Sequence, residues 1–366
     1  MAKFPLTEMA VKMFCPGNVV QPDDAGLPSI LVWIPKFKNS DVLTGGDDST
    51  HPAFIVNGKE IDGFYYSKYE NVVYNGKAYS LPAEDPAVNI SIDTARECCE
   101  SKGYGWHLST AAEWAAIALW CKKNGFLPYG NSSYGKYATE TEVKAIPSYK
   151  DKTVTNRVAT GTGPLTWSHD GTPSGIWDLC GNINEWQGGI RLVWGELQIL
   201  ANNDAADPDN PQNETSTCWK AIKAADGSLV DPECMITDAA VRTTGYTVKL
   251  NFVNDVWTYS TGISSAKDVS RDCLFEKVAC TNAISEAAKL RLRSLALLPD
   301  EGTAEGDYEG DKMYVINGMP LRVVSRSSLW NGGESAGVFA FNGNYDNVRE
   351  GTGYGFRSVY IPNIGE

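Results

Sequence analysis

Apolar residues recur along this chain in short alternating runs rather than in long periodic stretches. Runs of this kind, bounded by Gly, Pro, Asn and Asp, are typical of strands and turns. Between residues 246 and 260 two such runs flank Asn254 and Asp255, which predicts a β-hairpin with these residues at its tip. The pattern therefore predicts an α+β protein. Strands are expected at 30–34, 64–69, 192–194 and 197–200, and short helices at 93–99, with Asp93 as N-cap, and at 283–293.

The clearest helix signal begins at Thr110. Thr110 and Glu113 have the spacing of a capping box, in which each side chain accepts a hydrogen bond from the backbone amide of the other. Trp114 and Ile117 follow at the spacing of one buried helical stripe. Gly125 is expected to end the helix. We therefore predict a helix from about residue 110 to 124, with Trp114 and Ile117 in the core.

Composition and charge indicate a folded protein that does not bind polyanions. The chain has 366 residues, of which 42% are hydrophobic, and its 11 Trp, 17 Tyr and 11 Phe can supply a sizeable core. Its net charge of −13 argues against nucleic acid and anionic membrane surfaces as partners. No apolar run approaches the roughly 20 residues that span a bilayer, and the N-terminal stretch does not read as a secretory signal. We expect no membrane insertion, and folding in a cytoplasm.

The cysteines and histidines are not arranged as a recognisable metal or redox motif. Of the nine cysteines, Cys98 and Cys99 are adjacent, and no CxxC occurs, which favours free buried thiols. His51, His107 and His169 are far apart in the sequence and not at metal-ligand spacing, so ordinary polar or core histidines are expected. The alternative for the cysteines is a disulfide among Cys218, Cys234, Cys273 and Cys280.

Four sequence blocks between residues 30 and 360 carry a family resemblance. The first is LVWIPKF at 31–37 with GFYYSKYE at 63–70, and the second is GWHLSTAAEWA at 105–115. The third is GIWDLCGNINEW at 175–186, and the fourth is Arg326 with Trp330, closing with GFR at 355–357. In this order they resemble the formylglycine-generating-enzyme type of C-type lectin fold, with its patterns "G-x-R-L-P-T-E-A-E-W-E-x-A", "G-L-x-D-M-x-G-N-V-W-E-W" and "R-G-G-S-W … G-F-R".

This resemblance implies a domain organisation. A single C-type-lectin-type domain is expected over residues 28–366, after an N-terminal lead-in at 1–27. The third and fourth blocks are about 140 residues apart, further than the minimal fold needs. Residues 191–311 are therefore interpreted as an elaborated insertion. Trp114, Ile117, Trp186, Trp330 and Phe356 are expected to be core residues.

The sequence departs from that family where its enzymes hold their metals. His107 replaces the usual Arg, and Asn184 replaces the usual Trp. In the resembling family, formylglycine generation is similar to a copper–thiolate oxidase and uses paired cysteines near the fourth block, but the last cysteine here is Cys280, well before Arg326. The sulfoxide-synthase branch uses a histidine iron site, and the last histidine here is His169. We therefore expect no enzyme activity, with an oxidoreductase of either type as the alternative.

The fourth block has a closer counterpart. Residues 330–342, WNGGESAGVFAFN, resemble the "W-N-N-G-x-x-A-G-V-F-A-L-N" of variable proteins from diversity-generating retroelements, which implies a variable ligand-binding segment at about 326–357. The segment is also rich in Ser, Gly, Asn, Tyr, Trp and Arg, which recognition surfaces favour. Positions standing where that family varies are Leu329, Gly332, Ser335, Tyr345, Asn347, Arg349, Gly351, Gly353 and Tyr354. Positions matching its fixed scaffold are Trp330, Gly333, Ala336, Gly337, Val338, Phe339, Ala340, Gly355, Phe356 and Arg357.

Together these features predict a receptor-recognition protein that displays a hypervariable site on a rigid lectin-type scaffold. The resemblance implies a phage receptor-binding protein or adhesin. Its expected partner is a protein or glycan on a target cell surface, and its expected location is a virion tail, or the cytoplasm before assembly. The variable positions should be solvent-exposed, with Tyr345, Arg349 and Tyr354 as the main binding anchors. The remaining alternative, a structural virion component without a ligand, predicts that residues 329–354 are buried.

The third block also carries oxygen atoms of the kind that Ca²⁺ prefers. Asp178, Asn182, Glu185 and the carbonyl of Ile183 could supply them. The resembling family often binds calcium near this block, so calcium is the one cofactor that the resemblance suggests. The alternative is that Asn182 and Glu185 hydrogen-bond to the backbone of a tight turn.

Overall fold

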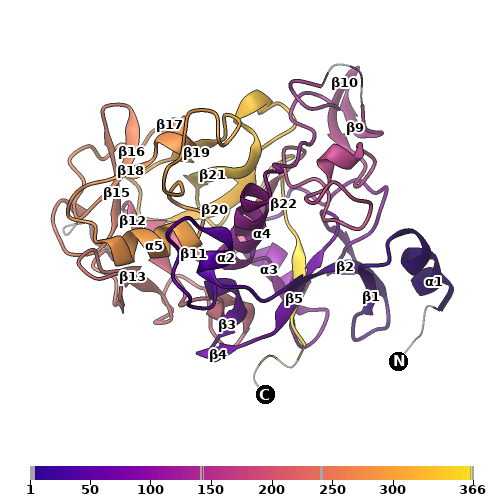
Figure 1. Cartoon of the computed structure of the whole chain (residues 1–366), viewed down its shortest axis with the longest axis horizontal. Coiled ribbons are helices and arrows are strands. Elements are labelled where there is room, and N and C mark those ends of the chain that lie inside the picture. Colours follow the sequence, from indigo (N-terminus) through magenta and orange to yellow (C-terminus); the bar gives the residue numbers. More distant parts are fainter. Residues whose placement is uncertain (1–4, 141, 143, 240–241, 363, 365–366) are drawn as a thin grey trace.

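The computed structural model describes residues 5–140, 142, 144–239, 242–362 and 364. It is a mixed α and β structure, mostly sheet with few helices, which confirms the coarse prediction (Figure 1). The described helices are too short or too polar to cross a bilayer. They are α1 (Pro5–Phe14), α2 (Asn39–Val42), α3 (Ile92–Glu100), α4 (Ala111–Lys123) and α5 (Glu286–Ser294).

The smaller of two main sheets joins the two ends of the chain. Its C-terminal strand lies between two strands from the first third of the sequence, as the yellow ribbon among indigo and purple ones shows in Figure 1. In spatial order the strands are β1 (Asn18–Pro22), β2 (Pro28–Pro35), β5 (Gly63–Ser67), β23 (Ser358–Tyr360) and β8 (Trp106–Leu108). Because β1 pairs with β2, residues 18–22 belong to this sheet rather than to a separate lead-in.

The larger sheet has 12 strands among the described residues and contains both the C-terminal segment and most of the expected insertion. In spatial order its main path is β17 (Arg271–Leu274), β19 (Lys312–Val315), β21 (Gly337–Tyr345), β20 (Arg322–Ser327), β11 (Asn184–Val193), β12 (Glu196–Ile199), β15 (Lys249–Val253), β16 (Val256–Ser260) and β18 (Ala279–Cys280). Off this path, β13 (Lys220–Ile222) pairs with β12 and β14 (Leu229–Val230), and β22 (Tyr354–Gly355) pairs with β11.

Much of the stretch interpreted as an insertion is continuous with the larger sheet. Strands β12, β15 and β16 continue the sheet outward from β11, and the hairpin of β15 and β16 turns at Asn254 and Asp255 as predicted. Both turn residues have positive φ, at 51° and 59°, which Asn and Asp tolerate. Three short hairpins complete the strands: β3 (Ile55–Val56) with β4 (Lys59–Glu60), β6 (Val72–Tyr74) with β7 (Lys77–Tyr79), and β9 (Pro147–Asp151) with β10 (Val154–Val158).

Helix α4 packs against the larger sheet and is capped as predicted. The Thr110 hydroxyl accepts from the Glu113 amide, and Glu113 Oε2 accepts from the Thr110 amide at 3.0 Å. Trp114 and Ile117 are buried, and Trp114 Nε1 donates to the carbonyl oxygen of Val338 at 2.7 Å. This bond ties the second sequence block to the fourth.

Helix α3 begins differently from the prediction. Its N-cap is Ser91, whose hydroxyl accepts from the Thr94 amide, and not Asp93. Asp93 lies inside the first turn and pairs with Arg96 at 2.8 Å. Ser and Asp are both favoured at N-caps, and an acidic residue is also favourable in the first turn of a helix. The sequence alone therefore does not distinguish Ser91 from Asp93 as the N-cap.

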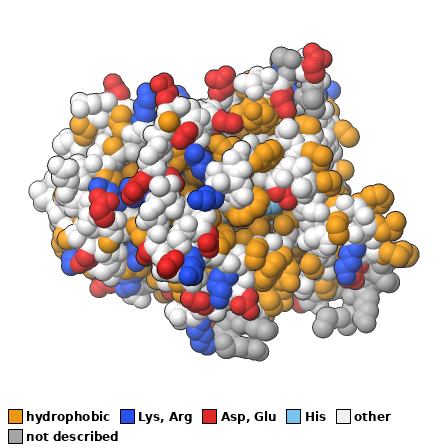
Figure 2. Space-filling model, in the orientation of Figure 1, with side chains coloured by type: hydrophobic (Ala, Val, Ile, Leu, Met, Phe, Trp, Pro, Cys, Tyr) orange, Lys and Arg blue, Asp and Glu red, His pale blue; other side chains and the backbone are white. Residues whose placement is uncertain are grey.

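A broad apolar groove lies on the face that carries β2 and α4. Figure 2 shows apolar side chains gathered there. The groove has a volume of about 700 Å³, and its lining includes Trp33, Ile117 and Trp120. The described residues that line it do not include any of the C-terminal segment.

Candidate functional site

The C-terminal segment, residues 326–357, runs through the centre of the larger sheet. Its regular parts are the end of β20, then β21 and β22. Two irregular stretches connect them, and we call these the turn (residues 328–336) and the loop (residues 346–353). The turn contains a single 3₁₀ turn, Gly333–Ser335. The sheet therefore fixes the position of the segment, and the turn and the loop display its side chains, as loops do in many binding proteins.

The positions that match the fixed scaffold pack inward. All of them are buried except Gly333, which is partly exposed. Phe356 and Arg357 are fully buried, and Trp330 is 9% exposed. The core prediction is confirmed for Trp114, Ile117, Trp186, Trp330 and Phe356, which are all buried.

The predicted variable positions divide into two groups. Arg349 is exposed, and six others are partly exposed. Gly353 and Tyr354 are buried, so the predicted exposure of these two is wrong. The reason is that β22 pairs with β11, which stacks the Tyr354 ring on Trp186 with 4.9 Å between ring centroids. The partly exposed positions are Leu329, Gly332, Ser335, Tyr345, Asn347 and Gly351.

Space rather than backbone conformation restricts the glycine positions in this group. A Cβ at Gly353 would overlap Leu329 Cδ2, and one at Gly332 would lie 2.7 Å from Ser328 Oγ. At Gly351 the nearest atom would be Tyr354 Cδ2 at 3.3 Å, an approach that small shifts relieve. Gly351 is therefore the most tolerant of the three.

A small hollow opens between the sheet and the turn, with a volume of about 210 Å³. We call it the basin. Its floor is polar and its walls are largely aromatic. The floor includes Asn184, Ser325, Asn342 and Asn344, and the walls include Tyr314, Leu329, Tyr345 and Tyr354.

A β-bulge brings floor and wall residues onto one face of the sheet. Ser325 pairs with Asn342, but two residues earlier on β20 Val323 pairs with Tyr345, so β21 has one extra residue between these pairs. Bulges of this kind re-aim side chains. Here the bulge places Tyr345 on the same face as Asn342, which strict alternation along β21 would forbid.

The basin floor offers polar atoms without a protein partner. Ser325 is fully buried, and neither its Oγ nor Asn344 Oδ1 has a hydrogen-bond partner among the described residues. A buried polar group without a partner costs about 1–3 kcal/mol. A ligand that hydrogen-bonds to these atoms would recover that energy.

Aromatic rings and one arginine form the wall nearest the loop. Tyr354 stacks on Trp186, and Tyr345 meets Tyr354 edge-on at 5.2 Å. The Arg349 guanidinium lies 4.6 Å from the ring centre of Tyr345 and 5.3 Å from that of Tyr354. Burial, followed by the hydrogen bond from Tyr345, raises the pKa of the Tyr354 hydroxyl, so Tyr354 remains a neutral phenol near pH 7. Of the three predicted anchors, Tyr345 and Arg349 are accessible and Tyr354 supports them.

The entrance to the turn is conformationally strained. Ser327 and Ser328 have φ values of 79° and 85°, in the region that residues other than Gly rarely adopt. They stand where the resembling pattern "R-G-G-S-W" has two glycines. Ser327 is buried and donates to the Gly181 carbonyl at 2.9 Å, while Ser328 lines the basin. Strain of this kind clusters at binding and active sites.

Main-chain hydrogen bonds from elsewhere hold the turn. The Tyr134 amide donates to the Trp330 carbonyl at 2.8 Å, and the Gly333 amide donates to the Ser132 carbonyl at 2.9 Å. None of these four groups is a side chain. These two bonds therefore do not depend on the side chains that the turn displays.

The loop is held in the same way. Three consecutive carbonyl groups near its end each accept a hydrogen bond from a different part of the chain. The bonds come from the Asn89 amide to Gly351 (3.0 Å), from Arg157 Nη1 to Thr352 (2.9 Å) and from the Asn184 amide to Gly353 (2.8 Å). The loop backbone is fixed by these partners, while its own side chains face outward at Asp346, Val348, Arg349 and Glu350.

The expected calcium ligands hold a different cation. The Arg357 guanidinium lies among them, and Nε donates to Glu185 Oε2 at 2.8 Å. Its remaining donors reach the backbone carbonyls of Ser67, Lys68, Trp177 and Asp178 at 2.6–3.4 Å. All five N–H groups of Arg357 thus have acceptors.

Asn182 is also committed to protein partners. Its Oδ1 accepts from Asn131 Nδ2 at 3.0 Å and from the Val158 amide at 2.9 Å, and its Nδ2 donates to Glu70 Oε2 at 2.5 Å. The side chain of Ile183 is buried in the core. Protein partners thus occupy Asn182, Asp178 Oδ2 and Glu185 Oε2, while Asp178 Oδ1 and Glu185 Oε1 have no partner among the described residues. The calcium site stays a prediction.

Three carboxylates surround Arg357, and we call these four residues the Arg357 cluster: Glu70, Asp178, Glu185 and Arg357. All four are fully buried. Burial raises the pKa of all three carboxyl groups, and that of Asp178 to about 6, although the Gly161 amide and Arg357 lower it. One guanidinium cannot neutralise three carboxylates, so a proton is expected on this cluster near neutral pH.

The cysteines are unpaired and the histidines are buried apart from one another. All nine cysteines are free thiols, so the alternative disulfide among Cys218, Cys234, Cys273 and Cys280 is not formed. The three histidines are buried and apart, and His107 Nε2 hydrogen-bonds to Glu113 Oε1 at 2.8 Å. In the part of the chain that the structure describes, no group of three or more His, Cys, Asp and Glu side chains is placed to hold a metal ion.

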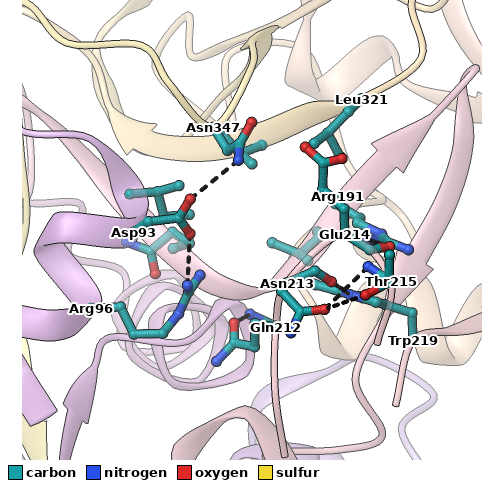
Figure 3. Close-up of a pocket in the computed structure, with 15 residues that line it drawn as sticks. Asp93, Arg96, Arg191, Gln212, Asn213, Glu214, Thr215, Trp219, Leu321 and Asn347 are labelled. Atoms are coloured by element: carbon teal, nitrogen blue, oxygen red, sulfur yellow. Dashed lines mark hydrogen bonds and ion pairs between the residues drawn. The ribbon is translucent and has the colours of Figure 1, made fainter. Parts of the chain in front are cut away.

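The polar floor of the basin is the part of the site that the sequence reasoning missed. Its signal was available in β21, where Asn342 and Asn344 alternate with apolar residues. Asn347, in contrast, points away from the basin and toward Asp93 on α3, across a second cavity (Figure 3). No protein-family model matches the chain, and a search of curated proteins returns no match. The interpretation of the site therefore depends on its geometry.

Proposed function

We propose that this chain is a ligand-binding protein whose C-terminal segment displays an adaptable recognition site on a rigid scaffold. One observation carries the proposal. The backbones of the turn and the loop are anchored by hydrogen bonds from Asn89, Tyr134, Arg157 and Asn184, which lie outside both stretches. Among the displayed side chains, Ser335 and Asn347 add hydrogen bonds of their own. A site built this way can change its side chains without losing its shape.

The proposed scaffold is a C-type lectin fold of the formylglycine-generating-enzyme type. Contacts between the sequence blocks support it. Glu185 of the third block pairs with Arg357 of the fourth at 2.8 Å, and Trp114 of the second block donates to the Val338 carbonyl. Arg357 also binds the carbonyl of Lys68 in the first block. The residues that carry the resemblance thus meet in one core.

The basin suits one protruding group of a larger ligand. Its volume of about 210 Å³ is below the roughly 300–1,000 Å³ usual for pockets that enclose a small molecule. Tyrosine walls and a floor of amides and a hydroxyl are typical of surfaces that recognise proteins and glycans. Around it, Val348 is 73% exposed and Arg349 is exposed, which extends the contact surface along the loop.

We accordingly propose a protein or glycan on a cell surface as the target, and a virion tail as the setting. The exposure of Arg349 and the partial exposure of Leu329 and Tyr345 favour this role over that of a structural component, which would bury them. Catalysis is not part of the proposal. The polar side chains that line the basin are amides, hydroxyls, phenols and the guanidinium of Arg326.

A selection experiment tests the proposal. Leu329, Ser335, Tyr345, Asn347 and Arg349 are randomised together, and the library is displayed on yeast and selected against two unrelated proteins, lysozyme and serum albumin. We expect folded clones that bind one target and not the other. As a control, a library of the same size is randomised at five exposed positions of α1 and of the β9–β10 hairpin. Equal recovery of binders from the control, or none from the first library, would contradict a dedicated recognition site.

A further inference from the structure

A second cavity lies between α3, β11, the stretch 212–219 and the loop, with a volume of about 350 Å³ (Figure 3). Its lining combines apolar side chains, including Ile92, Ile190 and Leu321, with amides and two arginines. Asn347 is the one predicted variable position that lines it. The volume is at the lower end of the usual range for small-ligand pockets.

The hydrogen-bond acceptors of this cavity are largely in use. Asp93 Oδ1 accepts from Arg96 Nη1 at 2.8 Å, and Asp93 Oδ2 accepts from Asn347 Nδ2 at 3.1 Å. The side-chain oxygens of Gln212 and Asn213 accept from backbone amides at 2.7 and 3.1 Å. In Figure 3 Asp93, Arg96 and Asn347 lie on one side of the cavity, and Asn213 lies opposite them.

The donors, in contrast, are in surplus. Arg96 Nε is buried and has no acceptor among the described residues. Arg191 donates from Nε to Gln198 Oε1 at 2.9 Å and from Nη1 to the Glu214 carbonyl at 3.2 Å, with its guanidinium 4.3 Å from the Trp219 ring centre. Within the described part of the chain, Arg191 Nη2 has no acceptor. A cavity with spare N–H donors and occupied acceptors selects for an anionic ligand.

Arg191 remains charged in this environment. Burial lowers the pKa of Arg191 to about 10, while the nearby carboxylate of Glu214 raises it, so the guanidinium is protonated at neutral pH. Arg96 forms an ion pair with Asp93. Glu214 is exposed at the rim and is the lining acid whose carboxylate has no ion-pair partner among the described residues. It competes with any incoming anion.

We propose that this cavity binds an acidic sugar, with the carboxylate of the sugar placed against Arg96 and Arg191. A planar guanidinium matches a carboxylate with two parallel hydrogen bonds. The apolar surface of Ile92, Ile190 and Leu321 suits the C–H face of a sugar ring, and the surrounding amides suit its hydroxyls. The proposal does not depend on ligand binding at the basin, because the two linings share no residue.

Titration calorimetry with glucuronate tests this site, with glucose as the neutral counterpart of the same ring. We expect saturable binding of glucuronate and none of glucose. Arg96→Gln and Arg191→Lys should each weaken glucuronate binding by about tenfold, as loss of a hydrogen bond to a charged group does. Glu214→Gln should strengthen it by about twofold to threefold, because it removes an exposed competing charge.

Three outcomes would overturn the proposal. The first is that glucuronate does not bind the wild-type protein, and the second is that Glu214→Gln weakens glucuronate binding. The third is that glutamate binds as tightly as glucuronate, which would assign the cavity to free carboxylates rather than to sugars. Thermal melts establish whether each variant is folded. If Arg191→Lys does not fold, the affinity of Arg96→Gln for glucuronate decides the test. Tyr345→Ala, in the basin, should leave glucuronate affinity unchanged. That result separates this site from the proposed recognition site, which can fail or succeed independently.

Discussion

The Arg357 cluster and the basin are two polar regions built by the same C-terminal segment, and they treat buried polar atoms in opposite ways. Around Arg357 every guanidinium donor has an acceptor, and the atoms left over are carboxylate oxygens of Glu70, Asp178 and Glu185, which a proton can satisfy. In the lining of the basin the atoms left over are the neutral Ser325 Oγ and Asn344 Oδ1, together with Nε of the Arg326 guanidinium. Only a water molecule or a ligand can satisfy those.

The comparison separates polar groups that hold the fold from polar groups that are available to a partner. A buried cation whose donors are all paired fixes geometry, since removing it leaves uncompensated charges. Incomplete pairing next to a cavity costs stability but leaves hydrogen bonds for a ligand to form. Changes in the first region should therefore alter stability, and changes in the second should alter binding.

The largest effect is expected at Arg357. Arg357→Gln removes the cation from three buried carboxyl groups and should lower the free energy of unfolding by about 3–5 kcal/mol in urea titrations. The matched control is Arg349→Gln, the same chemical change on the loop surface, which should cost no more than about 0.5 kcal/mol. Equal effects of the two substitutions would remove the distinction between the regions.

The charge excess of the Arg357 cluster should make stability depend on pH. A carboxyl group whose pKa is raised by folding stabilises the protein below its unfolded pKa, and this contribution is lost as the pH rises through the folded value. For Asp178, raised from 3.8 to about 6, stability should fall between about pH 4 and pH 7. Asp178→Asn keeps an acceptor for the Gly161 amide and should remove part of the fall.

Urea titrations of the wild type and Asp178→Asn across this pH range measure the effect. The variant should gain stability relative to the wild type as the pH rises, by an amount on the order of 3 kcal/mol for a shift of about two pKa units. A difference that stays constant with pH would show that Asp178 does not carry the extra proton.

A smaller effect is expected where the loop meets the turn. Gly353→Ala places a methyl group against Leu329 Cδ2 and should cost about 1–3 kcal/mol, as overpacking does. Leu329→Ala removes the obstructing atom, so the double variant should recover a large part of that loss. Additive destabilisation in a double-mutant cycle would argue that the obstruction lies elsewhere, at Trp330.

The smallest effect should have the opposite sign. Ser328→Gly relieves a φ of 85° at the edge of the basin and should raise the free energy of unfolding by about 1 kcal/mol. Ser216→Gly, in an irregular stretch without this backbone strain, is the control and should not stabilise. Thermal melts compare the two, and destabilisation by Ser328→Gly would mean that the hydroxyl contributes more than the strain costs.

The sequence was most informative where one local pattern determines one local structure. The capping box at Thr110 and Glu113, the hairpin tip at Asn254 and Asp255, and the buried Trp114 depend on residues close in the chain. Spacing and turn chemistry are sufficient for such features. The fixed positions of the C-terminal segment were also predictable, because apolar residues at matching places must be buried somewhere.

The predictions that the structure does not support concern residues whose contact partners are distant in the sequence. Asp178 and Glu185 have the chemistry of calcium ligands, and only the fold brings Arg357 to them from more than 170 residues away. Tyr354 has the composition of a recognition residue but pairs with β11, which buries it. The bulge in β21 has no signature that distinguishes it from plain alternation, so the placement of Tyr345 beside the polar floor of the basin could not be derived from the sequence.

The C-terminal segment contains two sets of side chains, one that supports the fold and one that is displayed to solvent, and we expect the two sets to act independently. The most direct test measures the folded fraction of two libraries of equal size by surface display and protease resistance. One library randomises Leu329, Ser335, Tyr345, Asn347 and Arg349, and the other randomises Trp330, Phe339, Gly353, Tyr354 and Phe356. We predict that most members of the first library fold and that few members of the second do. Similar folded fractions in the two libraries would contradict the claim.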